Sequence, residues 1–302
     1  MYEQIGQNKR RTVVLVGAFV VFVALVAIAV NLLVRGGPIG FVVAVLIAAA
    51  MAFAGYWKSD SVALAMSRAQ PAERAQFAQY HNLVEGLCIA AGLPKPRLYV
   101  IEDDAPNAFA TGRNPEHAAV AVTTGLLAKM NRVELEGVLA HELSHIKNYD
   151  ILVSTLAVTM VGIVILLSDF AIRFLWWGGG RNSSSDRQNS GPMAILSILG
   201  FFLLIFSPII ARLLQFAVSR NREELADVSG VGLTRYPPGL ISALEKLRDD
   251  QTVTHSASKA TAHLWIEQPV ARTPEEGRMS RFNRLFDTHP PLEERIERLR
   301  EL

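Results

Sequence analysis

Hydrophobic residues of this chain gather in four long runs, separated by more polar segments. The first two, about 13–34 and 38–57, flank a short turn with Arg35, and each approaches the ~20 apolar residues that span a bilayer. The other two, about 151–170 and 193–213, are weaker, and a buried core helix is the alternative for each. The pattern predicts four transmembrane helices in two hairpins.

The N-terminal run could also belong to a cleaved signal peptide, because basic residues 9–11 precede it and small residues Ala27 and Ala29 lie inside it. The run exceeds the ~7–15 apolar residues of a signal peptide, and a second run follows at once, which favours an uncleaved anchor. Basic residues flank the first pair of runs on one side, and Arg35 alone lies in the opposite turn. That asymmetry predicts that the richer side is cytoplasmic.

The polar segments 58–150 and 218–302 would then lie together on the cytoplasmic side. Neither segment has a complete pattern of its own, so we expect one domain assembled from both. The chain is accordingly divided into an N-terminal hairpin, a first domain segment, a second hairpin and a second domain segment: residues 1–57, 58–150, 151–217 and 218–302.

The first domain segment mixes helical and strand periodicities. Apolar residues alternate with polar ones at 97–101, and two further short strands are expected at about 108–111 and 118–123. A helix is expected from about Arg132 through Asn148, with apolar residues at helical spacing. The fold class predicted is α+β, with one cytoplasmic domain of helices and strands on four membrane helices.

Composition agrees with this division. Half of the 302 residues are hydrophobic and the mean hydropathy is +0.25, which is more apolar content than one water-soluble domain of this length needs. The net charge of only +2 gives no reason to expect a nucleic-acid partner. Cys88 is the single cysteine, so it forms no intramolecular disulfide, and we expect it to be buried as a small hydrophobic residue.

The informative motif is His141-Glu142-Leu143-Ser144-His145. Residues four apart lie on one face of a helix, so both imidazoles can reach one metal ion, and Glu142 stands beside them. Two histidines leave room on zinc for a third protein ligand and a water, for which a neighbouring carboxylate can act as general base. The alternative is a solvated helix face that carries two histidines and a glutamate.

The segment 220–227 can supply the third ligand, because Glu223 and Asp227 lie one helical turn apart in it. An ordinary charged helix surface, with Arg220 and Arg222 as intrahelical partners, is the alternative. Glu224 is the rival ligand, and only the spacing to Asp227 favours Glu223.

Together these motifs resemble the HtpX-like membrane zinc proteases, which are relatives of the CAAX prenyl endoproteases. The resemblance extends over nearly the whole chain. It is carried by the segments 141–150, 219–227, 107–112, 260–264 and 287–291, and by the four hydrophobic runs.

The resemblance implies that His141, His145 and Glu223 bind one Zn²⁺ per chain and that Glu142 activates the water. Asp227 would not bind the zinc itself but would accept a hydrogen bond from a zinc-bound histidine, because a metal-bound imidazole usually donates its other N–H to a carboxylate. Since the histidines precede the third run and Glu223 follows the fourth, we expect the zinc just above the cytoplasmic face of the bilayer.

Two further roles are hypotheses. Asn107, Ala108 and Phe109 would form an edge strand that binds extended substrate by strand addition, unless the strand is internal. His289 would stabilise the oxyanion, although the start of a docked C-terminal helix also explains its segment.

The sequence thus predicts a multi-pass metalloendopeptidase of the bacterial inner membrane, with a zincin-like peptidase domain assembled from two chain segments and an active site that faces the cytoplasm. Its partners would be the lipid bilayer and protein or peptide substrates, chiefly misfolded or damaged membrane proteins in quality control, as the resemblance implies. The alternatives are a prenyl-protein processing protease, an intramembrane protease and a non-catalytic zinc-binding membrane scaffold.

Overall fold

We describe the fold from a computed structural model, which covers residues 6–8, 10, 12–14, 16–18, 20–21, 24, 37–158, 220–256, 261, 264–266 and 290–302. The helices are α2 (Gly37–Met66), α3 (Ala78–Ala91), α4 (Thr124–Lys129), α5 (Arg132–Lys147), α8 (Arg220–Thr234), α9 (Pro237–Asp249) and α11 (Leu292–Arg300), with a 3-10 turn η1 (Pro115–His117). The strands are β1 (Gln70–Pro71), β2 (Arg97–Ile101), β3 (Ala108–Gly112) and β4 (Ala118–Thr123).

The four strands form one sheet in the order β1-β2-β4-β3. β2 and β4 pair in parallel, whereas β3 and β1 pair antiparallel with their neighbours, so β3 forms one edge. The three longer strands confirm the strand predictions from periodicity. β1 was not predicted, because a strand of two residues has no alternation to detect.

Alternate residues of β4 enter two different cores. Val120 and Val122 face the larger core, which joins α3 and α5 to α8, α9 and α11, whereas Ala119 and Ala121 face the end of α2, Leu264 and Trp265. The larger core thus includes side chains from both polar segments of the chain. Cys88 lies in it, as predicted, and burial raises the pKa of its thiol to about 11.

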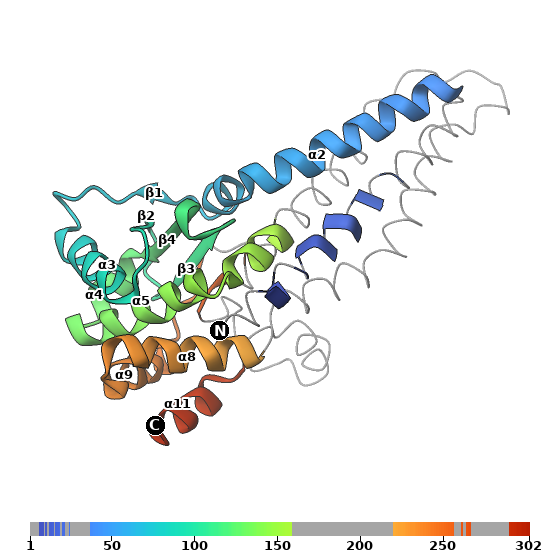
Figure 1. The fold of residues 1–302 in the computed structure, drawn as a ribbon. Coiled ribbons are helices and arrows are strands. Elements are labelled where there is room, and N and C mark those ends of the chain that lie inside the picture. The colour runs from blue at the N-terminus through green and yellow to red at the C-terminus, as the bar shows by residue number, and fades with distance from the viewer. Residues whose placement is uncertain are drawn as a thin grey trace, which may run out of the picture.

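Helix α5 is central to this arrangement and begins with a capping box. The Asn131 side chain accepts hydrogen bonds from the backbone N–H groups of Val133 and Glu134, and the Glu134 carboxylate accepts from the Asn131 backbone. Figure 1 shows α5, α8 and α9 packed against one another beside the sheet, as their close contacts indicate. The helix predicted for 132–148 is therefore confirmed to within one residue at its end.

Helix α2 includes the predicted second span and extends beyond it as one helix of 30 residues. It runs away from the sheet and helices in Figure 1. None of the helices in the described part of the chain combines the length and apolar character needed to cross a bilayer. The four spans thus stay a prediction: 193–213 lies outside the described residues, as do most of 13–34 and the part of 151–170 after residue 158.

Glycine allows α8 to approach α5 at the histidine motif. A Cβ atom on Gly230 would lie 3.0 Å from the backbone nitrogen of His141 and 3.2 Å from the Ala140 carbonyl carbon. Gly232 lies on the same helix with nothing within 4 Å of such a Cβ. The close helix contact therefore depends on Gly230 and not on Gly232.

We predict that Gly230→Ala destabilises the protein by about 1–3 kcal/mol, because a backbone atom cannot move aside as a flexible side chain can. Gly232→Ala should be neutral or stabilising, since alanine favours helix at an open position. Thermal unfolding of the full-length chain measures both, and equal stability of the two variants would contradict the close contact.

A buried carboxylate joins α5 to α9. Glu134 accepts hydrogen bonds from Lys246 Nζ at 2.7 Å and from Ser242 Oγ at 2.7 Å. Burial alone would raise the pKa of Glu134, but Lys246, the Asn131 backbone and Ser242 outweigh it and lower the pKa below its ordinary value of 4.5. The stabilisation is therefore present above about pH 4.5 and is lost as pH falls through the lower, folded-state pKa.

We predict that Glu134→Gln lowers the free energy of unfolding at pH 7 by about 1–2 kcal/mol, a value reduced because Lys246 is partly exposed. The loss should shrink when both proteins are measured at a pH below the folded-state pKa. Asp249→Asn, which breaks an exposed ion pair with Arg248, is the control and should have little effect. An undiminished difference in acid would contradict the ionic account.

Candidate metal centre

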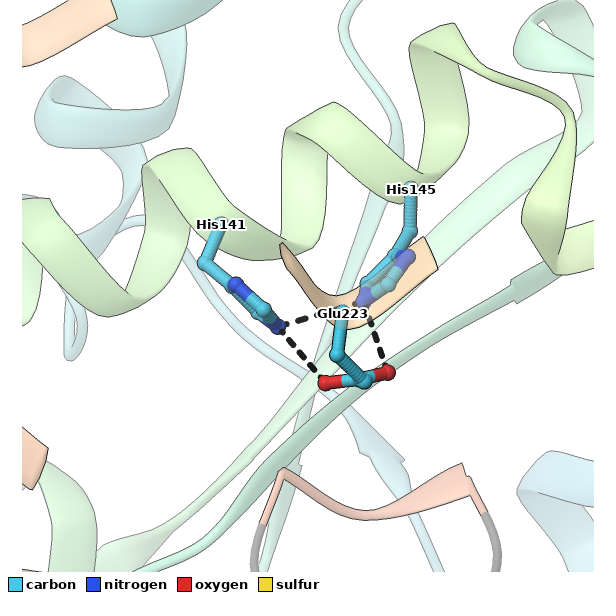
Figure 2. Close-up of side chains that lie close together, drawn as sticks. All are labelled: His141, His145 and Glu223. Atoms are coloured by element: carbon cyan, nitrogen blue, oxygen red, sulfur yellow. Dashed lines mark hydrogen bonds and ion pairs between the residues drawn. The ribbon is translucent and has the colours of Figure 1, made fainter. Parts of the chain in front are cut away.

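His141, His145 and Glu223 converge in the interior, from α5 and α8 (Figure 2). The two histidine Nε2 atoms lie 3.1 Å apart. The Glu223 carboxylate oxygens lie 3.6 Å from the Nε2 of each histidine. All three side chains offer one ligand atom within 4.8 Å of the others, so the group can hold a metal ion.

Each histidine is oriented by a carboxylate at its other ring nitrogen. Nδ1 of His141 lies 2.8 Å from Asp227 Oδ1, and Nδ1 of His145 lies 3.2 Å from Asp150 Oδ2. Each carboxylate accepts a hydrogen bond from an Nδ1–H group, which leaves the lone pair of the neutral imidazole on Nε2. Both lone pairs therefore point to the place where Glu223 also points.

A buried arginine completes the charge balance on one side of the group. Arg295 of α11 is 2% exposed and donates to both Asp227 oxygens, at 2.9 and 2.6 Å. Its Nη1 lies 3.5 Å from Glu223 Oε2. A bidentate contact of this kind fixes the Asp227 carboxylate in the plane of the guanidinium group.

The neighbouring charges raise the pKa values of both histidines. Burial and the Arg295 cation lower the pKa of His141, but Asp227 and Glu223 outweigh them and raise it to about 9. Burial also lowers the pKa of His145, and the Asp150 hydrogen bond and Glu223 more than compensate. Burial raises the pKa of Asp227, but Arg295 and His141 outweigh burial and lower it below its ordinary value, so the carboxylate stays ionised. Around the two imidazoles the carboxylates of Asp227, Asp150 and Glu223 thus outweigh the Arg295 cation, as a cation site requires.

Glu142 follows His141 on α5 and is 2% exposed. Burial raises the pKa of Tyr80, and the negative charge of Glu142 raises it further. Burial lowers the pKa of Arg295, but Glu142 is among the acids that outweigh burial and raise it. The carboxylate therefore lies in the same interior region as the histidines.

The structure buries all three predicted substrate-binding residues. Asn107 is 1% exposed, and its Oδ1 accepts a hydrogen bond from the Ala108 backbone N–H. The Ala108 carbonyl accepts from Ile266 at 3.0 Å, and Trp265 lies edge-on to Phe109 with ring centroids 4.9 Å apart. The chain itself thus covers this part of the β3 edge. The substrate-binding role stays a prediction, and His289 lies outside the described residues.

Two residues at the site were not assigned a role from sequence. Asp150 lies just after α5, where no helical spacing rule connects it to His145. Arg295 carries a detectable signal: it lies three residues after Leu292 and four before Leu299, so helical periodicity places it on the buried face of α11. A charged residue on that face requires a buried partner.

Comparison with known proteins agrees with this site. Residues 74–302 match Peptidase family M48. Proteins described as "Protease HtpX homolog" are 43% identical in Streptococcus uberis, over 100% of both chains, and 45% identical in Limosilactobacillus reuteri, also over 100% of both. The crystal structure of S. mikatae Ste24p is similar with a TM-score of 0.49 and 18% sequence identity, over 99% of this chain and 66% of that one.

The chain belongs to Peptidase family M48. It is a zinc metalloprotease, and the resemblance drawn from its motifs is confirmed.

The adjacent residues Glu223 and Glu224 allow a matched test of the ligand set. Glu223 is 4% exposed and faces the histidines, whereas Glu224 is exposed and forms a 2.8 Å ion pair with Arg298. We predict that Glu223→Ala weakens zinc binding by more than the ~10–100-fold that loss of an outer partner costs. Glu224→Ala should bind zinc like the unchanged protein. Chelator competition with metal analysis measures both, and equal zinc retention would refute the assignment.

Proposed function

We propose that this chain is a membrane-bound endopeptidase in which His141, His145 and Glu223 hold the catalytic zinc and Glu142 is the general base. The observation that carries the proposal is the convergence of two imidazole nitrogens and one carboxylate, each within 4.8 Å of the others. Two histidines and one carboxylate form a donor set that zinc accepts in hydrolytic sites.

The number of gathered side chains favours an enzyme over a structural zinc site. Structural zinc sites have four protein ligands, whereas catalytic sites have three and an open position. Within the described ranges, the group that could hold a metal consists of three residues. That count favours catalysis over a non-catalytic scaffold.

Bound zinc supplies Lewis-acid chemistry, which polarises the scissile carbonyl and lowers the pKa of water to about 7. Glu142 accepts a proton from the attacking water, so that the hydroxyl adds to the carbonyl carbon. It then returns the proton to the amide nitrogen as the C–N bond breaks. Asp227 and Asp150 hold the two imidazoles in orientation meanwhile.

Peptide substrates would bind in extended form beside β3, with Asn107, Ala108 and Phe109 at the edge and His289 near the oxyanion. The edge position of β3 supports strand addition. Since Ile266 now bonds to Ala108, segment 264–266 would have to shift for a substrate to pair there.

Membrane attachment is the second part of the proposal. Apolar side chains along the first half of α2 are exposed, including Ile39, Val42 and Leu46, and residues of this type in contact with water are unfavourable. Lipid contact would remove that cost. With the four hydrophobic runs as spans, the peptidase domain would face the cytoplasm of a bacterial inner membrane and act on misfolded or damaged membrane proteins.

We predict that Glu142→Gln retains zinc and loses about 10²–10⁴-fold in cleavage rate, because the amide cannot accept the proton. The assay is cleavage of an unfolded protein by detergent-purified, zinc-loaded enzyme. Glu136→Gln on the same helix is the control and should cleave normally.

Cleavage by Glu142→Gln at the unchanged rate would remove Glu142 from the mechanism. Inactivity of the unchanged protein with zinc bound would instead support a non-catalytic role. Comparing a stable and a destabilised form of one membrane-spanning substrate tests the quality-control role, which requires faster cleavage of the destabilised form.

A further inference from the structure

An N-terminal asparagine reaches the metal centre from the other end of the sequence. Asn8 lies in a helical segment and is 3% exposed. Its Nδ2 donates to the Asn148 backbone carbonyl at 2.9 Å and to Asp150 Oδ1 at 2.8 Å. The Asn8 amide nitrogen thus donates both of its protons, one to Asn148 and one to Asp150, which lie two residues apart in the sequence.

These acceptors flank a strained turn. Tyr149 has a φ of 60°, a left-handed conformation that is unfavourable for a residue with a side chain. The turn ends α5 and sets the position from which Asp150 reaches back to His145. A side chain that bonds to both sides of Tyr149 therefore holds the turn in the conformation that the contact requires.

Asp150 divides its two oxygens between these partners. Oδ1 accepts from Asn8 and lies 3.7 Å from Arg222 Nε, whereas Oδ2 lies 3.2 Å from His145 Nδ1. With Oδ1 held by Asn8, rotation of the carboxylate is restricted and Oδ2 stays directed at the histidine. Because Asp150 is 4% exposed, water can supply little of this restraint.

We infer that Asn8 is a positioning residue for the metal centre, which acts through Asp150 to orient His145. This inference rests on the proposal that His145 binds zinc. It connects the N-terminal segment, which leads into the first hydrophobic run, to the ligand geometry of the peptidase domain. The N-terminal segment is then part of the support of the active site as well as a proposed anchor.

The test measures zinc affinity and not activity. Full-length protein carrying Glu142→Gln, which prevents self-cleavage, is titrated with zinc against a chromogenic chelator in detergent. Asn8→Ala should weaken zinc binding about tenfold, at the lower end of the range for outer partners of metal ligands. Asn8→Ser can donate one hydrogen bond and should lie between Asn8→Ala and the parent protein.

Thr12→Val is the matched control, because Thr12 is also buried, one turn further along the N-terminal segment. It should leave zinc affinity unchanged. In the Asp150→Ala background, Asn8→Ala should cause no further loss, because contacts that act through one residue are not additive. A general structural role for Asn8 would instead give additive losses.

The outcomes separate this inference from the proposed function. Unchanged zinc affinity in both Asn8 variants, or additive losses with Asp150→Ala, would overturn the role of Asn8. His145→Ala in the same assay should abolish tight binding. If His145→Ala also left affinity unchanged, the metal site itself would be wrong.

Discussion

Each site histidine is held at Nδ1 by a carboxylate, and the rest of the metal centre depends on that pairing. Asp227 and Asp150 place the lone pairs of His141 and His145 on Nε2, where the two atoms lie 3.1 Å apart. Bringing these electron-rich groups together in a buried place is unfavourable unless a cation compensates them. The domain is built so that each carboxylate has its own support, from Arg295 and from Asn8.

The packing of three helices determines whether these supports can reach the site. Gly230 lets α8 lie against the backbone of α5 at His141, and Glu223 and Asp227 lie on the same face of α8, seven and three residues before it. Helix α11 then places Arg295 over Asp227. Asn8 of the N-terminal segment contacts the turn that ends α5. Segments from the beginning, middle and end of the sequence therefore meet at one group of ligands.

Local patterns predicted the parts of this centre that depend on local spacing. Periodicity within a few residues predicts the helix that carries His141 and His145, its start near Arg132, and the three longer strands. The one-turn spacing of Glu223 and Asp227 is a local pattern of the same kind. Asn8 and Asp150 are 142 residues apart, so no local pattern connects them. Arg295 lay within reach of prediction, since its position on the buried face of α11 signals a partner, but the sequence does not specify that the partner is Asp227.

The most direct test of the central claim is an anomalous diffraction map of the zinc-loaded protein, recorded at the zinc absorption edge. The account predicts one peak bonded to His141 Nε2, His145 Nε2 and a Glu223 oxygen, at the ~2.0–2.2 Å typical of zinc with these ligands. A single peak bonded to other residues, in protein that still cleaves its substrate, would contradict it.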